Sequence, residues 1–216
     1  GPNKARGGTD DYRMQTDAGG AGGLVSLTMS NKSTVSTSGA NAPAIVLASF
    51  GGIGGTATAN TSTYYASNGG AGGTVTFTNN GGTVTTSGAN SSAVVLQSVG
   101  NKGGTGGGGA FTSAAPGGSG GDGGPVTAVN SGTITTGGAY GFGILAQSVG
   151  GSGGQGAKSA FASGGSGGAT GFGGKVSITN NGTIKTAGAG ATAILAQSIG
   201  GGNALDAFQA ATPSAN

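Results

Sequence analysis

The sequence predicts an all-β protein, a parallel β-helix or β-solenoid of about four repeats of about 50 residues each. Three observations support this prediction. A short motif ending in Ser49 recurs with its serine at Ser98, Ser148 and Ser198, in steps of 49, 50 and 50 residues. Short runs alternate apolar residues with Ser and Thr, which is typical of half-buried strands. Glycine accounts for 55 of the 216 residues and gathers in stretches between these runs.

The repeats form one continuous solenoid domain in this prediction. They span residues 19–68, 69–119, 120–169 and 170–216, and the last repeat is truncated. Residues 1–18 hold a Gly-Pro dipeptide typical of a cleaved expression tag, followed by the tail of a preceding repeat. A single repeat cannot bury its apolar face, whereas repeats stacked about 4.8 Å apart share one core and pair their strands.

Each repeat contains three predicted strands. The first reads LVSLT, TVTFT, PVTAV or KVSIT, and the second reads TVST, TVTT, TITT or TIKT. Alternation places two apolar residues of the first strand and one of the second on the core side. These core residues are Val25, Leu27, Val35, Val75, Phe77, Val84, Val126, Ala128, Ile134, Val176, Ile178 and Ile184. The third strand, for example AIVLAS, is apolar on both faces, so we expect both faces to be covered.

Asparagine and glycine mark the corners between the strands, because both tolerate the left-handed backbone of a sharp turn. The corner after the second strand holds a glycine in every repeat. The corner after the first strand holds an asparagine that recurs in phase. Stacked corner asparagines can satisfy one another's amides and hold the register, so they are predicted to be structural. The predicted ladder consists of Asn31, Asn80, Asn130 and Asn180.

The second half of each repeat is a Gly-rich excursion with an aromatic residue near its middle. These aromatics are Tyr65, Phe111, Phe161 and Phe208. One interpretation is that each excursion folds back over the outside of the third strand and seats its aromatic there. Triplets such as GGSGGDGG would suit an extended threefold helix. The alternative is a flexible surface loop.

The second strands also present a possible outward binding array. Its members are Thr34, Thr83, Thr85, Thr133, Thr135 and Thr183. A flat Thr-x-Thr array is the kind of face that ice-binding solenoids present. A simpler explanation is that Thr favours strands and is soluble on an outer face. Ser36 and Lys185 interrupt one of the two columns, which favours the simpler explanation.

The phrases NGTIKTAG and ILAQSIGGG resemble the Gly-rich repeats in passenger regions of bacterial autotransporters, the type V secretion family. The resemblance covers roughly residues 19–202. It implies a right-handed parallel β-helix exported through the outer membrane, and a role as an adhesin, biofilm factor or surface fibre. The lack of Cys agrees with the resemblance, because passengers cross the membrane unfolded and a disulfide would obstruct them.

Composition argues against several functions. The chain has no His, Cys or Glu, and its five Asp residues do not recur with the repeat, so we predict no catalytic, metal or cofactor site. The eight basic residues are spread along the chain, which argues against nucleic-acid binding. No apolar run approaches the roughly 18 residues of a membrane span, so we expect no membrane contact.

The sequence therefore predicts a non-enzymatic structural or adhesive passenger fragment at the bacterial cell surface. Its partner would be a host, surface or neighbouring-cell component, and the fragment could also associate with itself end to end or side by side. An alternative is a solenoid that binds ice or polysaccharide through the Thr array. A third possibility is a β-helix hydrolase whose catalytic residues lie outside this fragment.

Overall fold

The computed structural model describes residues 16–57, 65–108 and 113–201. All regular secondary structure in these ranges is β-strand. Across the same ranges, no helix is long and apolar enough to cross a membrane.

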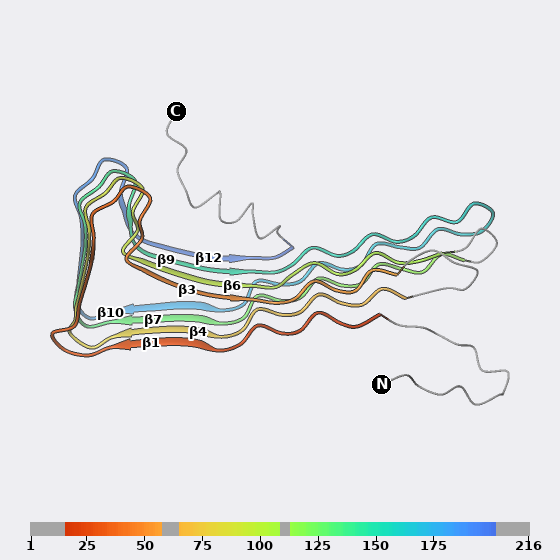
Figure 1. Cartoon of the computed structure of the whole chain (residues 1–216), viewed down its shortest axis with the longest axis horizontal. Helices are drawn as coiled ribbons and strands as arrows, with labels where there is room; N and C mark the ends of the chain where they lie inside the picture. Colours follow the sequence, from red (N-terminus) through yellow and green to blue (C-terminus); the bar gives the residue numbers. More distant parts are fainter. Residues whose placement is uncertain (1–15, 58–64, 109–112, 202–216) are drawn as a thin grey trace.

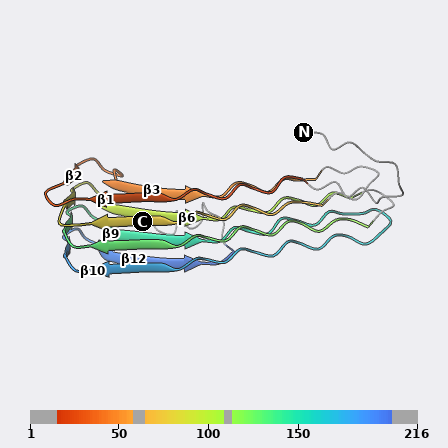
Figure 2. The same cartoon turned by 90° about the horizontal axis from the view of Figure 1, so that it is seen from below.

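Three strands recur in each of four layers. The first layer contains β1 (Val25–Met29), β2 (Thr34–Thr37) and β3 (Ile45–Phe50), and the second contains β4 (Val75–Asn79), β5 (Thr83–Thr86) and β6 (Val94–Val99). The third layer contains β7 (Val126–Asn130), β8 (Thr133–Thr136) and β9 (Phe142–Val149), and the fourth contains β10 (Val176–Asn180), β11 (Thr183–Thr186) and β12 (Thr192–Ile199). Equivalent strands pair in parallel. They form a first sheet β1-β4-β7-β10, a second sheet β11-β8-β5-β2 and a third sheet β12-β9-β6-β3 (Figures 1 and 2). The predicted parallel β-solenoid of four repeats is confirmed.

The core lies between the three sheets and is continuous through the layers. Phe77 of the first sheet, Ile134 of the second and Leu96 of the third are all fully buried in one apolar cluster. The core-side residues predicted for the first two strands of each repeat all belong to this cluster or pack against it. Alternation within short strands therefore identified the buried faces correctly.

The corner between the second and third strands combines two backbone requirements. Asn41, Asn90, Tyr140 and Gly190 all have φ between 55° and 66°. The recurrent glycine of this corner meets a different need. A Cβ on Gly138 would lie 1.9 Å from the carbonyl oxygen of Gly88 in the layer below, closer than real Cβ atoms come. Close stacking of layers, rather than a left-handed backbone, explains that glycine.

The asparagine ladder runs through Asn79, Asn130 and Asn180. The Asn79 amide nitrogen donates to Asn130 Oδ1 at 2.9 Å, and the Asn130 nitrogen donates to Asn180 Oδ1 at 2.7 Å. Asn79 and Asn130 are fully buried.

The prediction that Asn31 and Asn80 belong to the ladder is wrong. Both lie in exposed turns, and Met29 pairs with Asn79 in the first sheet. The reason is that the turn after the first strand shortens along the chain. It spans residues 30–33 in the first layer, 80–82 in the second and only 131–132 in the third. The prediction aligned the asparagines at a constant distance from the third strand. In the first two repeats, this alignment selects an asparagine of the turn instead of the last residue of the first strand.

A serine column joins the third sheet to the start of the first sheet. Ser98 Oγ donates to the carbonyl of Gly73 at 2.6 Å and accepts the N–H of Gly124 at 2.8 Å. Ser148 repeats the arrangement with Gly124 and Gly174. Each serine thus links its own layer to the next layer, at the end of the third strand where the Gly-rich segment begins. The motif that revealed the repeat in the sequence is this junction.

The Gly-rich segments form arms that extend the two long sheets away from the solenoid. Outgoing arms (51–57, 100–108 and 150–158) continue the strands of the third sheet, and returning arms (16–24, 65–74, 113–125 and 163–175) lead into the first sheet (Figure 1). The arms of successive layers lie side by side (Figure 2).

Hydrogen bonds between the arms follow a three-residue period. Gly120 N–H donates to the carbonyl of Ala169 in the next returning arm, at 2.8 Å. Gly121 N–H donates to Asn101 in an outgoing arm, also at 2.8 Å. Asp122, the third residue of the triplet, is exposed. This pattern matches the threefold turn of a polyproline II helix, whose backbone groups bond to neighbouring chains. The three-residue period of these bonds agrees with the predicted threefold helix.

The predicted packing of the excursions over the third strand is wrong for the described residues. The arms run in line with the strands because each Gly-rich chain finds its backbone partners in other arms. Phe161 is 76% exposed near the far end of the arms, and Tyr65 is partly exposed. Phe111 and Phe208 lie outside the described residues.

An aromatic side chain at the start of a third strand covers part of the outer face of the third sheet. Phe142, at the start of β9, packs with Leu145 and with Val95 of the layer below, and all three side chains are buried. In the first layer the equivalent face is open, with Val46 52% and Phe50 55% exposed. The apolar outer face predicted for this strand is therefore buried in the inner layers and exposed at one end.

Candidate functional site

The outer face of the second sheet carries the predicted Thr array. The register places Thr34, Thr83, Thr133 and Thr183 in one column, and Ser36, Thr85, Thr135 and Lys185 in a second column. All eight side chains are exposed or partly exposed. Neighbouring members lie about 4.8 Å apart between layers and about 6.6 Å apart along a strand. The structure thus brings all six threonines predicted for the array onto one flat face.

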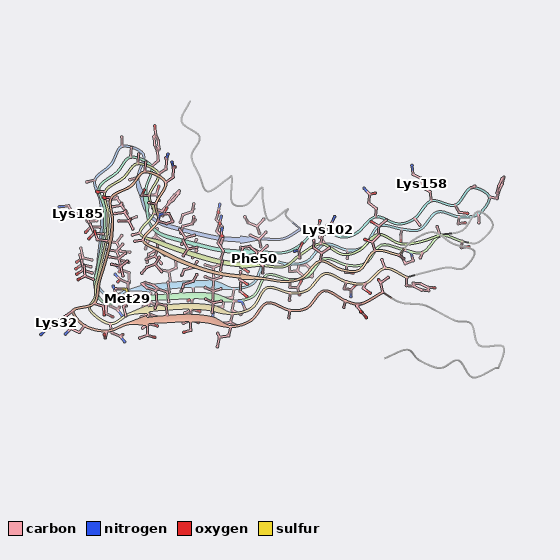
Figure 3. All side chains as sticks on the ribbon, viewed as in Figure 1. Met29, Lys32, Phe50, Lys102, Lys158 and Lys185 are labelled. Atoms are coloured by element: carbon pink, nitrogen blue, oxygen red, sulfur yellow. The ribbon has the colours of Figure 1, made fainter. Side chains whose placement is uncertain are left out.

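This array offers hydroxyl and methyl groups at regular spacing. Each threonine hydroxyl can both donate and accept a hydrogen bond, so the face can order water or contact sugar hydroxyls. Lys185 is the charged exception and projects from the outer side of the second sheet (Figure 3). Its place in the fourth layer leaves the hydroxyl columns of the first three layers uninterrupted.

The first sheet carries a second hydroxyl array that was not predicted from the sequence. Its columns are Ser26, Thr76, Thr127 and Ser177, and then Thr28, Thr78, Val129 and Thr179. All are exposed or partly exposed. The signal was present in the sequence, because Ser or Thr alternates with the core residues of the first strands, except at Val129 in the third repeat. The Thr-x-Thr pattern of the second strand is more regular, and it alone predicted a binding array.

Three lysines lie on the arms. Lys102 and Lys158 belong to outgoing arms of successive layers (Figure 3), and Lys175 is the last residue of a returning arm. Acidic side chains are rarer in the described ranges, where Asp17 and Asp122 belong to returning arms. No group of three or more His, Cys, Asp or Glu side chains that could hold a metal ion occurs within the part of the chain that the structure describes.

Comparisons with known proteins provide little guidance. No protein-family model matches the chain, and a comparison with curated proteins finds no match. Among solved structures, the chain is similar to a springtail antifreeze protein from Granisotoma rainieri, described as a bundle of nine polyproline type II helices whose crystal waters match the ice lattice. The identity is 26%, over 72% of this chain and 97% of that one. The TM-score is 0.22, so the two backbones do not superpose as one fold, and we base no argument on this similarity.

Proposed function

We propose that this chain is a rigid structural and adhesive module of a bacterial cell-surface protein, an autotransporter passenger exported through the outer membrane. The observation that carries the proposal is the continuous hydrogen bonding of the arms. Gly118 N–H donates to Gly104 at 2.9 Å, and Gly104 N–H donates to Ser67 at 2.9 Å. Such bonds link the described parts of the outgoing and returning arms through successive layers, so these Gly-rich segments are held by backbone hydrogen bonds as the sheets are.

A module of this kind is suited to bearing load. Each layer is tied to the next by three strand pairings, by the serine junction and by the arms. In stacked repeats, stability is distributed over such nearest-neighbour interfaces, so no single layer acts as a soft hinge. The resemblance of NGTI and ILAQS phrases to passenger repeats supports the surface location. Stiffness is the property that a stalk or fibre needs to hold an adhesive face away from the cell.

Adhesion in this proposal uses the flat outer faces of the first and second sheets. Their Ser and Thr columns present hydroxyl groups in register between layers, interrupted by Val129 in the first sheet and by Lys185 in the second. Many weak contacts over a stiff face add up, because the second and later contacts become intramolecular once the first has formed. The target would be a surface rich in hydrogen-bonding groups on a host, a neighbouring cell or a substratum.

Display of the chain on a non-adhesive bacterial host is expected to increase retention of cells under flow several-fold over the display carrier alone. A Gly118→Val variant should lose this gain because the arms no longer pack, whereas Ser119→Val, which alters an outward position, should keep it. Retention is counted by microscopy at fixed shear, with equal surface expression verified by an epitope tag. Retention no better than that of the carrier, or equal retention by both variants, contradicts the proposal.

A second candidate function is binding of ice or a polysaccharide by the Thr array. The specific observation in its favour is the unbroken register of Thr83 with Thr133 and of Thr85 with Thr135. The first column continues through all four layers, and this sheet face is the most regular hydroxyl lattice among the described residues.

Thr85→Tyr combined with Thr135→Tyr is expected to abolish such binding without loss of the fold, because bulky rings break the flat lattice. The matched control is Thr76→Tyr with Thr127→Tyr, at equally exposed outward positions of the first sheet. Inhibition of ice recrystallisation and retardation in polysaccharide-containing gels measure the activity, and circular dichroism monitors the fold. If ice or polysaccharide binding survives the first pair of substitutions, the Thr array is not the binding site and this second candidate function is wrong.

A further inference from the structure

Asparagine is followed directly by glycine at several turns of the chain. In the described ranges these pairs are Asn68-Gly69, Asn80-Gly81 and Asn181-Gly182, and the asparagine of each is exposed. Such a pair can react with itself, because glycine has no side chain to obstruct the approach of its nitrogen to the side-chain Cγ of the asparagine. The reaction uses the glycine nitrogen as the nucleophile, so a hydrogen bond donated by that N–H opposes it. The three pairs differ in this hydrogen bond.

Backbone hydrogen bonds restrain two of the three pairs. Gly69 N–H donates to the carbonyl of Ser119 at 2.8 Å, and Ser119 N–H donates to Asn68 Oδ1 at 2.9 Å. Gly182 N–H donates to the carbonyl of Asn130 at 3.0 Å. Each of these glycine nitrogens must leave its acceptor before it can attack, which requires local opening of the structure.

The pair in the second layer lacks this restraint. Asn80 and Gly81 lie in the exposed turn between β4 and β5, and the Gly81 N–H has no hydrogen-bond acceptor among the described residues. Gly81 has a φ of 99°, a left-handed conformation that favours glycine. This turn belongs to an inner layer, because β4 pairs with β1 on one side and with β7 on the other. Its exposure therefore does not arise from an end of the stack.

We propose that Asn80 is a site of self-modification, at which the chain deamidates its own turn. The Gly81 nitrogen gives up its proton to water and attacks Asn80 Cγ. A new N–C bond closes a succinimide ring, while the C–N bond of the side-chain amide breaks and ammonia leaves. Water then opens the ring at either carbonyl. Opening at Cγ yields aspartate. Opening at the main-chain carbonyl yields isoaspartate, whose backbone runs through Cβ and Cγ and is longer by a methylene group.

The longer backbone disturbs the first member of the asparagine ladder. The Asn79 side chain closes the same turn, since it accepts the N–H of Gly82 at 2.7 Å and donates to the carbonyl of Gly82 at 3.1 Å. The same amide donates to Asn130 at 2.9 Å. An added methylene between Asn80 and Gly81 displaces Gly82 from Asn79 and weakens these bonds. Aspartate at position 80 keeps the backbone length and leaves the ladder intact.

The first test follows deamidation of the full chain at each of the three pairs. The protein is incubated at mildly alkaline pH, folded or in denaturant, and tandem mass spectrometry of its peptides locates the mass gain. Asn68 and Asn181 are internal controls. In the folded protein both should react on the order of tenfold more slowly than in denaturant, whereas Asn80 should stay within about threefold of its unfolded rate. The proposal is overturned if Asn80 is slowed as much as the controls, or if all three react equally fast in the folded protein.

A charge-matched comparison tests the effect on the ladder. Deamidated protein is separated by ion exchange, and its melting temperature is compared with that of the Asn80→Asp variant, which carries the same charge on a normal backbone. We expect Asn80→Asp to melt within about 1 °C of the parent protein, and the isoaspartate-containing fraction to melt about 3 °C lower or more, because buried groups lose partners. Equal melting temperatures for the deamidated fraction and the variant would contradict the proposed link between this turn and the ladder.

Discussion

Replacement of Gly118 by alanine is expected to destabilise the protein by about 3 kcal/mol or more, a large effect for one methyl group. Gly118 is buried between arms. A Cβ at this position would lie 2.0 Å from the carbonyl oxygen of Ser67. That oxygen accepts the N–H of Gly104 at 2.9 Å, so the backbone cannot move aside without breaking the bond. The clash involves backbone on both sides, and no rotamer change can relieve it.

The measurement is thermal unfolding by circular dichroism, combined with amide exchange in the arms. Ser119→Ala is the matched control, because Ser119 follows directly and is partly exposed. We expect the control to change stability by less than about 0.5 kcal/mol. In the Gly118→Ala protein, the amides of Gly120 and Gly121 should exchange faster while those of β7 stay protected. Equal melting temperatures for the two variants would mean that the arms do not pack as described.

Replacement of Asn130 by alanine is expected to cost about 3 kcal/mol, since it interrupts the buried ladder at its centre. The Asn79 amide would lose its acceptor at 2.9 Å, and Asn180 Oδ1 would lose its donor at 2.7 Å. Gly132 N–H, 3.3 Å from Asn130 Oδ1, would also lose its partner. Buried groups left unpaired cost about 1–3 kcal/mol each, and the loss is larger than the mean value of a hydrogen bond.

Asn80→Ala provides the control for this experiment and also tests the register. Asn80 is exposed in its turn, and the structure gives its side chain no place in the ladder. Its replacement is expected to change the free energy of unfolding by less than about 0.5 kcal/mol. Chemical denaturation of the two variants gives the comparison. A large loss for Asn80→Ala and a small one for Asn130→Ala would favour the ladder expected from sequence spacing.

Strand positions and faces were accessible from the sequence because each depends on a local rule. The second strands, such as Thr83–Thr86, occupy the ranges read from the TVTT pattern. Their outward threonines form the predicted columns, since side chains alternate strictly and equivalent strands pair without slippage. The first-sheet array could have been found in the same way, from the Ser and Thr residues beside Val75 and Phe77.

The register of the asparagine ladder and the course of the arms could not be predicted from the sequence in this way. The position of Asn79 depends on how many residues the turn to β5 contains, and only pairing with β7 decides which of two adjacent asparagines faces inward. The arms show a three-residue glycine period in the sequence, but the period does not say which chains they bond. Their partners lie in arms of other layers, as with Gly121 and Asn101.

The sequence by itself determined the repeat, the three strands of each layer, their buried faces and the threonine columns, because these follow from alternation and fixed spacing along the chain. Only the tertiary structure decided the course of the arms and the membership of the asparagine ladder. Those features depend on which backbone and amide groups satisfy one another between layers. A buried N–H or carbonyl must find a partner, and for a glycine chain without side chains that partner is specified by packing rather than by residue type.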